Sequence, residues 1–451
     1  MVVSSAMRPR GSTDVAFDPS TGQSLLFPVH TPRHILPTNV TADRHPFHRW
    51  FGFVPGFSPE YVRECIDQAD LAPGDHVLDP FAGCGTTMVE ANALGLPSLG
   101  FEPHVFLADI CRAKVLVDAN PDWALQIQRS LESGAASSSK PPALAPAAKA
   151  FLEKLLPADS LGTLLHAREA AKEFRGPKEL LARLILSRVL DLCSHSKTDG
   201  IYKAPTSRKL AASFATSLTT TSSMISKDLG FAREAGLTNQ AKVLPRSSED
   251  MSSVAPRSCG VLITSPPYLN NFDFAEMTRM HLYFWEYARD WNEISERVRA
   301  KLIVNTTTAL NGHRQKMEAY REETPAAVRA VLDSYQEDLA DRRRLKAGKK
   351  EYDRLVYPYF AQMTRVLKSA ATALKPRAPV RIIVSDAALY GVHIRTQEVL
   401  ATIMDSLCYD QIAIHKLRSR GHRWILDKRE GAADGLGEYE LIAVAPRRAS
   451  I

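Results

Sequence analysis

The sequence has few of the features that mark secreted, metal-binding or membrane-spanning proteins. Its six cysteines are scattered and form no Cys-x-x-Cys pair, so we expect reduced, mostly buried thiols in a cytoplasmic protein. Two close pairs, Cys193 with His195 and His45 with His48, have no second pair at zinc spacing, and we expect no metal. Residues 1–18 lack an apolar segment, and no apolar run reaches about eighteen residues. We therefore expect neither a secretory signal nor a membrane span.

Length and charge set broad limits on what the chain can be. At 451 residues it is long enough for one large domain with insertions, or for two domains. Its formal net charge of +7 favours a polyanionic partner, although many basic proteins bind no nucleic acid.

Short apolar segments alternate with helical patterns along most of the chain, which predicts an α/β fold with a mostly parallel sheet. The last two strands are close enough in sequence to be antiparallel. A helix should begin after Ser58, and one long helix should cover residues 274–290. The expected strands are 76–78, 98–101, 260–264, 380–385, 411–415 and 439–444.

The first chemical motif is DPFAGCGTT, from Asp79 to Thr87, between an expected strand and an expected helix. Gly83 and Gly85 allow the backbone to approach a ligand closely, and the helix that follows offers free N–H groups. Glu102 ends the next strand, where a carboxylate can accept hydrogen bonds from ribose hydroxyls. A tight turn without a ligand is the alternative, but the whole string with its glutamate favours a nucleotide-like cofactor.

The second motif is TSPPY, from Thr264 to Tyr268, directly after an apolar strand. Two prolines fix a rigid, extended loop. The amine of a nucleobase is a poor nucleophile because its lone pair is delocalised into the ring. Acceptors on its two N–H groups can make that lone pair available, and Ser265 Oγ and the Pro266 carbonyl are suitable. Tyr268 can stack on a base that has left the duplex.

Both motifs resemble those of the amino-methylating DNA methyltransferases, in which they are called motif I and motif IV. The resemblance implies a Rossmann-like methyltransferase fold with a mostly parallel seven-stranded sheet, and S-adenosylmethionine as cofactor. It implies a catalytic set of Ser265, Pro266, Pro267 and Tyr268. The aromatic segment from Trp50 to Phe57 resembles motif X, which closes over the methionine end of the cofactor. The implied cofactor-binding residues are Trp50, Phe51, Asp79, Phe81, Gly83, Gly85, Thr86, Thr87, Glu102 and Asp250.

The resemblance also bears on the target base. Ser-Pro-Pro-Tyr is typical of cytosine-N4 enzymes, whereas adenine-N6 enzymes more often have Asp or Asn before Pro-Pro-Tyr. The preference is not absolute, so adenine N6 stays as an alternative. Cytosine C5 methylation needs a Pro-Cys pair, and none occurs here. Asp250 or Glu249 would approach the cofactor adenine, but a solvated acidic turn explains both equally well.

Motif I and motif IV are separated by far more residues than a minimal fold needs. We expect an arm over 1–44, the methyltransferase domain over 45–117 and 236–451, and a charged insertion over 286–355. A largely helical insertion over 118–235 is the leading candidate for target recognition. Basic residues in two places are candidates for contacting DNA, with solvated surface as the competing interpretation. They are Lys203, Arg208 and Lys209 in the insertion, and Arg418, Arg420 and Arg423 near the end.

Three other functions compete with DNA methylation. An RNA base methyltransferase can share both motifs, and a non-catalytic nucleic-acid-binding subunit can keep the fold with degenerate motifs. A protein amide methyltransferase prefers Asn at the position of Ser265. The resemblance further implies a bacterial or archaeal cytosol or nucleoid, DNA as partner, and a cognate restriction endonuclease as a candidate partner.

Overall fold

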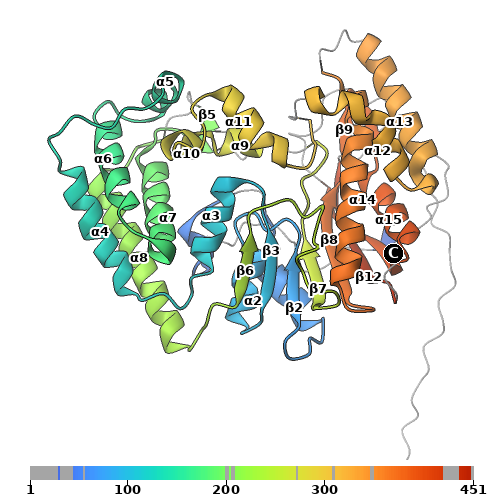
Figure 1. Ribbon diagram of the computed structural model, residues 1–451, viewed down its shortest axis with the longest axis horizontal. Helices are drawn as coiled ribbons and strands as arrows, with labels where there is room; N and C mark the ends of the chain where they lie inside the picture. The colour runs from blue at the N-terminus through green and yellow to red at the C-terminus, as the bar shows by residue number, and fades with distance from the viewer. Residues whose placement is uncertain are drawn as a thin grey trace, which may run out of the picture.

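The chain is described here from a computed structural model. One large sheet forms the centre of the molecule, with helices on both of its faces (Figure 1). The structure describes residues 29–30, 44–53, 56–198, 203–204, 209–270, 273–306, 310–345, 350–419 and 436–447.

In this part of the chain the large sheet has eight strands, in the order β1-β11-β12-β8-β7-β2-β3-β6. Five neighbouring pairs are parallel, and β12 is antiparallel to both β8 and β11. The expected fold class is confirmed: the sheet contains the seven strands that the resemblance implies, of which β6 is not among the six expected ranges, and the two-residue β1 is added at one edge. The strands are β1 (Val29–His30), β2 (His76–Asp79), β3 (Ser98–Phe101), β6 (Ala241–Leu244), β7 (Cys259–Thr264), β8 (Pro379–Ser385), β11 (Asp410–Ser419) and β12 (Gly437–Val444).

Fifteen α-helices lie in the described residues. They are α1 (Pro59–Asp67), α2 (Thr86–Ala93), α3 (Val105–Lys114), α4 (Asp122–Ala135), α5 (Pro146–Leu155), α6 (Ser160–Lys172), α7 (Gly176–Cys193), α8 (Phe214–Glu234), α9 (Phe274–Met277), α10 (Arg279–Phe284), α11 (Trp291–Arg297), α12 (Met317–Glu323), α13 (Ala326–Leu345), α14 (Val356–Ala373) and α15 (Thr396–Ser406). None of them is both long and apolar enough to cross a membrane.

The central strands are apolar throughout because both faces of the sheet are covered. Val77 of β2 and Val261 of β7 pack on the face that carries α1. Their neighbours Leu78 and Leu262 point the other way, toward a core that includes α14 and α15. All six residues of β7 are consequently buried. This double cover fixes the end of β7, where the second motif begins.

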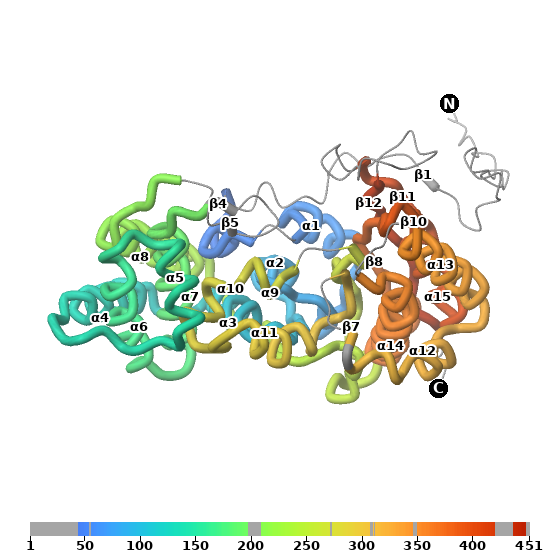
Figure 2. The backbone as a smooth tube through the Cα atoms, turned by 90° about the horizontal axis from the view of Figure 1, so that it is seen from above, coloured from blue at the N-terminus to red at the C-terminus, as the bar shows by residue number. Residues whose placement is uncertain are grey.

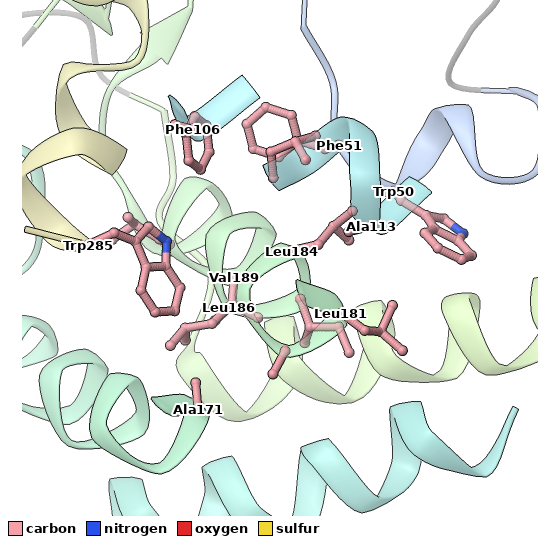
Figure 3. Packing of buried hydrophobic residues seen from close by; sticks show 14 of the residues in the cluster. Trp50, Phe51, Phe106, Ala113, Ala171, Leu181, Leu184, Leu186, Val189 and Trp285 are labelled. Carbon is pink, nitrogen blue, oxygen red and sulfur yellow. The ribbon is translucent and has the colours of Figure 1, made fainter. Parts of the chain in front are cut away.

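The residues between β3 and β6 form a helical body, with α4 to α8 at one end of the molecule (Figures 1 and 2). The short strands β4 (Lys197–Thr198) and β5 (Lys203–Ala204) lie between α7 and α8 in the sequence and pair antiparallel. The body shares one core with the N-terminal part of the sheet domain. Figure 3 shows Phe51 and Phe106 facing the α7 side chains Leu184 and Val189, so the insertion packs tightly on α3.

The prediction of one long helix over residues 274–290 is wrong. The chain forms α9 and α10 with a break at Thr278, whose hydroxyl bonds the Phe274 carbonyl. After α10 the backbone of Glu286 has a φ of 59°, in the left-handed region that cannot continue a helix. Asp290 then caps α11 by accepting a hydrogen bond from the Glu293 N–H.

Candidate active site

Three parallel strands end side by side at the edge where both motifs lie. β2 ends at Asp79, β3 is followed by Glu102, and β7 ends at Thr264. Because the carboxyl ends of parallel strands meet at one edge, this is where an open α/β sheet binds its ligands. The strand order brings together motifs separated by 185 positions, counted from Asp79 to Thr264.

Asp79 lies at the centre of this edge and is buried. Its carboxylate accepts hydrogen bonds from Thr87 Oγ1 at 2.7 Å, Thr264 Oγ1 at 2.6 Å and the Phe81 N–H at 3.0 Å. Burial raises the pKa of Asp79 above its usual value, and the bonds from Thr264 and Thr87 oppose that rise. Asp79 and Thr87 therefore direct their polar groups inward and shape the loop.

The glycine loop turns sharply between Asp79 and α2. Gly83 and Gly85 have φ of 52° and 87°, and Gly85 is the N-cap of α2. A Cβ at Gly85 would lie 2.7 Å from Cys111 Sγ, so packing excludes a side chain there. A Cβ at Gly83 would meet no atom within 4 Å. The open side of Gly83 therefore leaves room for a ligand against the backbone.

Glu102 faces the same loop. Its carboxylate accepts hydrogen bonds from the Gly83 N–H at 2.9 Å and the His104 N–H at 2.7 Å. Burial raises the pKa of Glu102 to about 7, and the two backbone bonds act in the opposite direction. A buried carboxylate beside open space at Gly83 can accept bonds from the hydroxyls of a ribose. These residues fit a nucleoside-containing cofactor.

The remaining residues of the first motif lie on either side of the loop. Phe81 is half-buried and packs against the core on the α14 side of the sheet. Thr86 is the first residue of α2 and is half-buried. Cys84 is also half-buried, and burial raises the pKa of its thiol to about 12, so it is a neutral thiol at physiological pH.

Trp50 and Phe51 are packed into the core shared with the helical insertion (Figure 3). Trp50 is fully buried, and its indole N–H donates to Asp228 Oδ2 of α8 at 2.9 Å. The ring of Phe51 contacts those of Phe106 and His281, with centroids 5.6 and 5.3 Å apart. These side chains fix the path of the segment before the sheet.

The side chains of the acidic turn after β6, Ser248, Glu249 and Asp250, have different surroundings. Asp250 is exposed, and the N–H of Ser252 donates to its carboxylate at 2.8 Å. Glu249 bonds Gln362 and Arg365 of α14. Ser248 is buried, and its hydroxyl has no hydrogen-bond partner among the described residues. In this turn Ser248 is therefore the polar group that a bound ligand could satisfy.

The second motif leaves β7 as an extended loop held from two sides. Tyr359 Oη of α14 donates to the Pro267 carbonyl at 3.0 Å. Tyr268 Oη donates to Glu438 Oε1 of β12 at 3.0 Å. Ser265 is half-buried and Pro266 is buried. The loop is thus a rigid element at the edge where the first motif lies, as catalysis by positioning requires.

The basic residues expected to contact nucleic acid lie at separate places. Arg208, Arg420 and Arg423 lie outside the described residues, and Lys203 belongs to β5. Lys209 Nζ donates to the Asp191 carbonyl at 2.6 Å, and burial lowers its pKa. Arg418 Nε donates to Glu438 Oε2 at 2.7 Å.

Sequence reasoning missed several residues of the site. Thr264 stands within the second motif, and its position at the strand end was the available signal. His104 Nε2 lies 2.8 Å from Thr278 Oγ1, and burial lowers the pKa of this imidazole to about 3. Its neutral ring links the N-cap of α3 to the break between α9 and α10. Glu438 lies 170 positions from Tyr268, and no local pattern marks it.

No group of three or more His, Cys, Asp or Glu side chains in the described ranges is arranged to hold a metal ion. The sheet order, the glycine loop and the buried Glu102 carboxylate are together consistent with an S-adenosylmethionine-dependent methyltransferase fold.

Comparisons with known proteins point to DNA methyltransferases. The profile of the N6/N4 methyltransferase family, described as DNA methylase, matches residues 53–111. M.BsoBI, a type II methyltransferase of Geobacillus stearothermophilus, is 23% identical over 88% of this chain and 84% of its own. M.AvaI, a type II methyltransferase of Nostoc sp., is 21% identical over 81% of this chain and 79% of its own. M2.DpnII of Streptococcus pneumoniae is 39% identical, over 15% of this chain and 25% of its own.

The chain is thus similar to S-adenosylmethionine-dependent DNA methyltransferases of the N6/N4 amino-methylating kind, over its glycine-loop region in the family profile and over most of its length in two type II methyltransferases. The matched residues include the glycine loop and Glu102.

Proposed function

We propose that this methyltransferase transfers a methyl group to the exocyclic N4 amine of cytosine in DNA. The observation that carries the proposal is the Ser-Pro-Pro-Tyr loop at the end of β7, next to the glycine loop at the end of β2. The serine before Pro-Pro-Tyr favours cytosine over adenine. Adenine N6 has the same chemistry and is the alternative that the test must separate.

Residues of the first motif would hold the cofactor. Gly83, Gly85 and the first turn of α2 would face its methionine part, and Glu102 would accept from the ribose hydroxyls. Ser248 is buried with an unsatisfied hydroxyl in the turn after β6, so it is a better candidate than exposed Asp250 for the adenine end. S-adenosylmethionine, when bound, supplies an electrophilic methyl group on its sulfonium.

Residues of the second motif would prepare the amine. Ser265 Oγ and the Pro266 carbonyl would accept bonds from its two N–H groups, which directs the lone pair out of the ring plane. The bound cofactor would supply its methyl group to this lone pair, and the proton that the amine then loses would pass to solvent. Tyr268 would stack on the base after it leaves the duplex. The rate enhancement would come from positioning and from fixed dipoles in a rigid loop.

The inserted helices α4 to α8 are our candidate for reading the target sequence. They pack on α3 and on the segment with Trp50 and Phe51, so a contact made by the insertion is rigidly joined to the cofactor side of the site. The relatives M.BsoBI and M.AvaI are named type II methyltransferases. By extension, we propose that this enzyme protects host DNA in a restriction–modification pair with a cognate endonuclease.

The test is to express the protein in cells that lack DNA methylation and to analyse their hydrolysed DNA by mass spectrometry. We expect N4-methylcytosine with the wild type, and a loss of about a hundredfold or more with Ser265→Ala. Arg447→Ala is a matched control, because this exposed side chain lies at the opposite edge of the sheet.

Three other results would each contradict a different part of the proposal. N6-methyladenine would keep the mechanism and overturn the base assignment. Unmodified DNA from a protein that still binds S-adenosylmethionine in calorimetry would overturn the DNA substrate, and methylation of structured RNA would then be measured. Unchanged methylation by Ser265→Ala would remove that hydroxyl from the mechanism.

A further inference from the structure

One buried carboxylate connects the second motif to the basic strand β11. Glu438 is only 7% exposed and lies at the start of β12. Its Oε1 accepts from Tyr268 Oη at 3.0 Å, and its Oε2 accepts from Arg418 Nε at 2.7 Å. The two oxygens therefore hold an aromatic ring of the motif on one side and a guanidinium on the other.

The sheet explains why these three residues meet. β12 is antiparallel to β8, and Glu438 pairs with Ser385 at the end of β8. The start of β12 consequently lies at the carboxyl edge of β8, beside the carboxyl end of β7. Arg418 is the direct partner of Glu438 on β11. The position of Glu438 is thus set by strand register.

The backbone next to Glu438 is also fixed. The Gly437 N–H donates to Asp386 Oδ1 at 2.8 Å, and its carbonyl accepts from Ser385 Oγ at 2.8 Å. A Cβ on Gly437 would lie 2.5 Å from the ring of Tyr439, so a side chain there would have to displace that ring. Asp386 is itself held by His393 Nε2 at 2.7 Å. This scaffold leaves Glu438 little freedom to move.

The electrostatics follow from burial. A carboxylate removed from water needs a partner for its charge, and Arg418 provides one. With that charge balanced, Glu438 can accept from the phenol of Tyr268. The Tyr268 ring is then fixed at two points, its Cα in the rigid loop and its hydroxyl at the far end. A ring fixed at both ends keeps one orientation, which stacking on a flipped base requires.

We propose that Glu438 is a positioning residue for methyl transfer, which orients the stacking face of Tyr268, and that Arg418 acts by holding Glu438. The inference rests on the proposed function, in which Tyr268 stacks on the target base. It assigns Arg418 a role through Glu438 instead of a contact with a DNA phosphate.

The test is a double-mutant cycle of Tyr268→Phe and Glu438→Ala. The probes are tritiated S-adenosylmethionine and genomic DNA from methylation-free cells. Each single variant should lower the single-turnover rate about tenfold, with apparent KM values for DNA and cofactor within about twofold of wild type. The double variant should be no slower than Glu438→Ala alone, because both changes remove the same bond. Glu438→Gln keeps an acceptor for the phenol and should recover part of the rate.

Arg418→Ala separates the two roles of the arginine. A phosphate contact would lower the slope of log K against log salt by about one. We expect that slope to stay unchanged and the single-turnover rate to fall, whereas Arg447→Ala at the other end of the sheet should match wild type in both. A changed salt slope with a normal rate would contradict the assigned role.

The outcomes separate the two proposals. No methyl incorporation by the wild type would overturn the proposed function and the positioning role together. Incorporation by the wild type, with losses that multiply in the double variant or with single variants as fast as wild type, would overturn the positioning role alone. Thermal unfolding of every variant identifies losses that come from misfolding. If Glu438→Ala does not fold, Glu438→Gln is used, and its remaining effect on the rate should disappear in the Tyr268→Phe background, where no phenol is left to donate.

Discussion

Thr264 Oγ1 donates a hydrogen bond to Asp79 Oδ1 at 2.6 Å, and both side chains are buried. Thr264 ends β7 and Asp79 ends β2, so this bond joins the loop of the second motif to the loop of the first. A methyl donor and its acceptor must be held in line and about 3–3.5 Å apart for transfer to be fast. The bond fixes the spacing between the two loops that would hold them.

The first prediction concerns this bond. Thr264→Val keeps the shape of the side chain and removes the donor, which leaves the buried carboxylate of Asp79 less well satisfied. We expect a loss of about 1–3 kcal/mol in the free energy of unfolding and a lower rate of methylation. Chemical denaturation and single-turnover assays measure the two effects. Thr264→Ser keeps the hydroxyl and should behave like wild type. Equal stability of the Val and Ser variants would contradict the role of this bond.

The second prediction contrasts the two glycines of the loop. Alanine at either position adopts a left-handed conformation, at a cost of about 1–2 kcal/mol. At Gly85 the new Cβ also collides with Cys111 Sγ, so Gly85→Ala should lose more stability, and Cys111→Ala should restore part of it. At Gly83 the Cβ projects into open space. The Gly83→Ala variant should therefore fold, but its affinity for the cofactor should be low. Calorimetric titration with S-adenosylmethionine of a folded Gly83→Ala protein checks this, and wild-type affinity would disprove it.

The third prediction is a pH dependence that arises at Glu102. Burial raises its pKa in the folded protein to about 7 from a usual value of 4.5. Its contribution to stability is therefore complete below about pH 4.5 and is lost as the pH rises to about 7. Ribose hydroxyls donate to the carboxylate form, so cofactor binding favours the deprotonated group. Between pH 6 and 8 we expect cofactor affinity to rise by about tenfold.

The control for this pH dependence is Glu102→Gln. The variant keeps the size of the side chain and cannot titrate, so any dependence that remains comes from other groups, including the amino group of the cofactor. Calorimetric titrations of both proteins at pH 6, 7 and 8 give the comparison. Parallel pH profiles for wild type and variant would assign the dependence elsewhere.

The sheet could be predicted from the sequence because its central strands are short, apolar and bounded by turn residues. Ser58 and Pro59 also marked the start of α1 correctly, and Ser58 accepts a hydrogen bond from the Tyr61 N–H. The division of residues 274–290 into separate helices could not be predicted from the sequence. The break lies at Thr278, which contacts His104 at the N-cap of α3, and helical periodicity does not contain that information.

Some residues of the candidate site could likewise be predicted from the sequence, and others could not. Asp79, the two glycines and Glu102 lie in strings whose spacing carries the chemistry, so reasoning from the sequence could reach them. Glu438 joins the site through strand register, and Ser248 is distinguished from Asp250 only by its burial. Register and burial are set by the whole fold, so these two residues could not be found before the strands were placed.

Asp228 of α8 is the basis of the last prediction, since it ties the helical insertion to the segment before the sheet. Its carboxylate accepts from Trp50 Nε1 at 2.9 Å and Arg49 Nε at 3.1 Å, with a further bond from Arg49 Nη2. Lys114 Nζ of α3 donates to the carbonyls of His48 and Phe51 at 3.0 and 2.8 Å. The segment is therefore clamped between the insertion and α3.

Asp228→Ala removes the insertion's side of this clamp and leaves a buried indole N–H without its acceptor. We expect a loss of about 2–4 kcal/mol in the free energy of unfolding. Asp228→Asn keeps an acceptor for Trp50 and loses the charge opposite Arg49, so it should be less damaging. Lys178→Ala is the control, because its exposed bond to Gln126 lies between two helices of the insertion itself. If the segment closes over the cofactor, Asp228→Asn should also weaken S-adenosylmethionine binding in calorimetry while Lys178→Ala does not. Unchanged affinity in a destabilised Asp228→Asn protein would limit the clamp to a structural role.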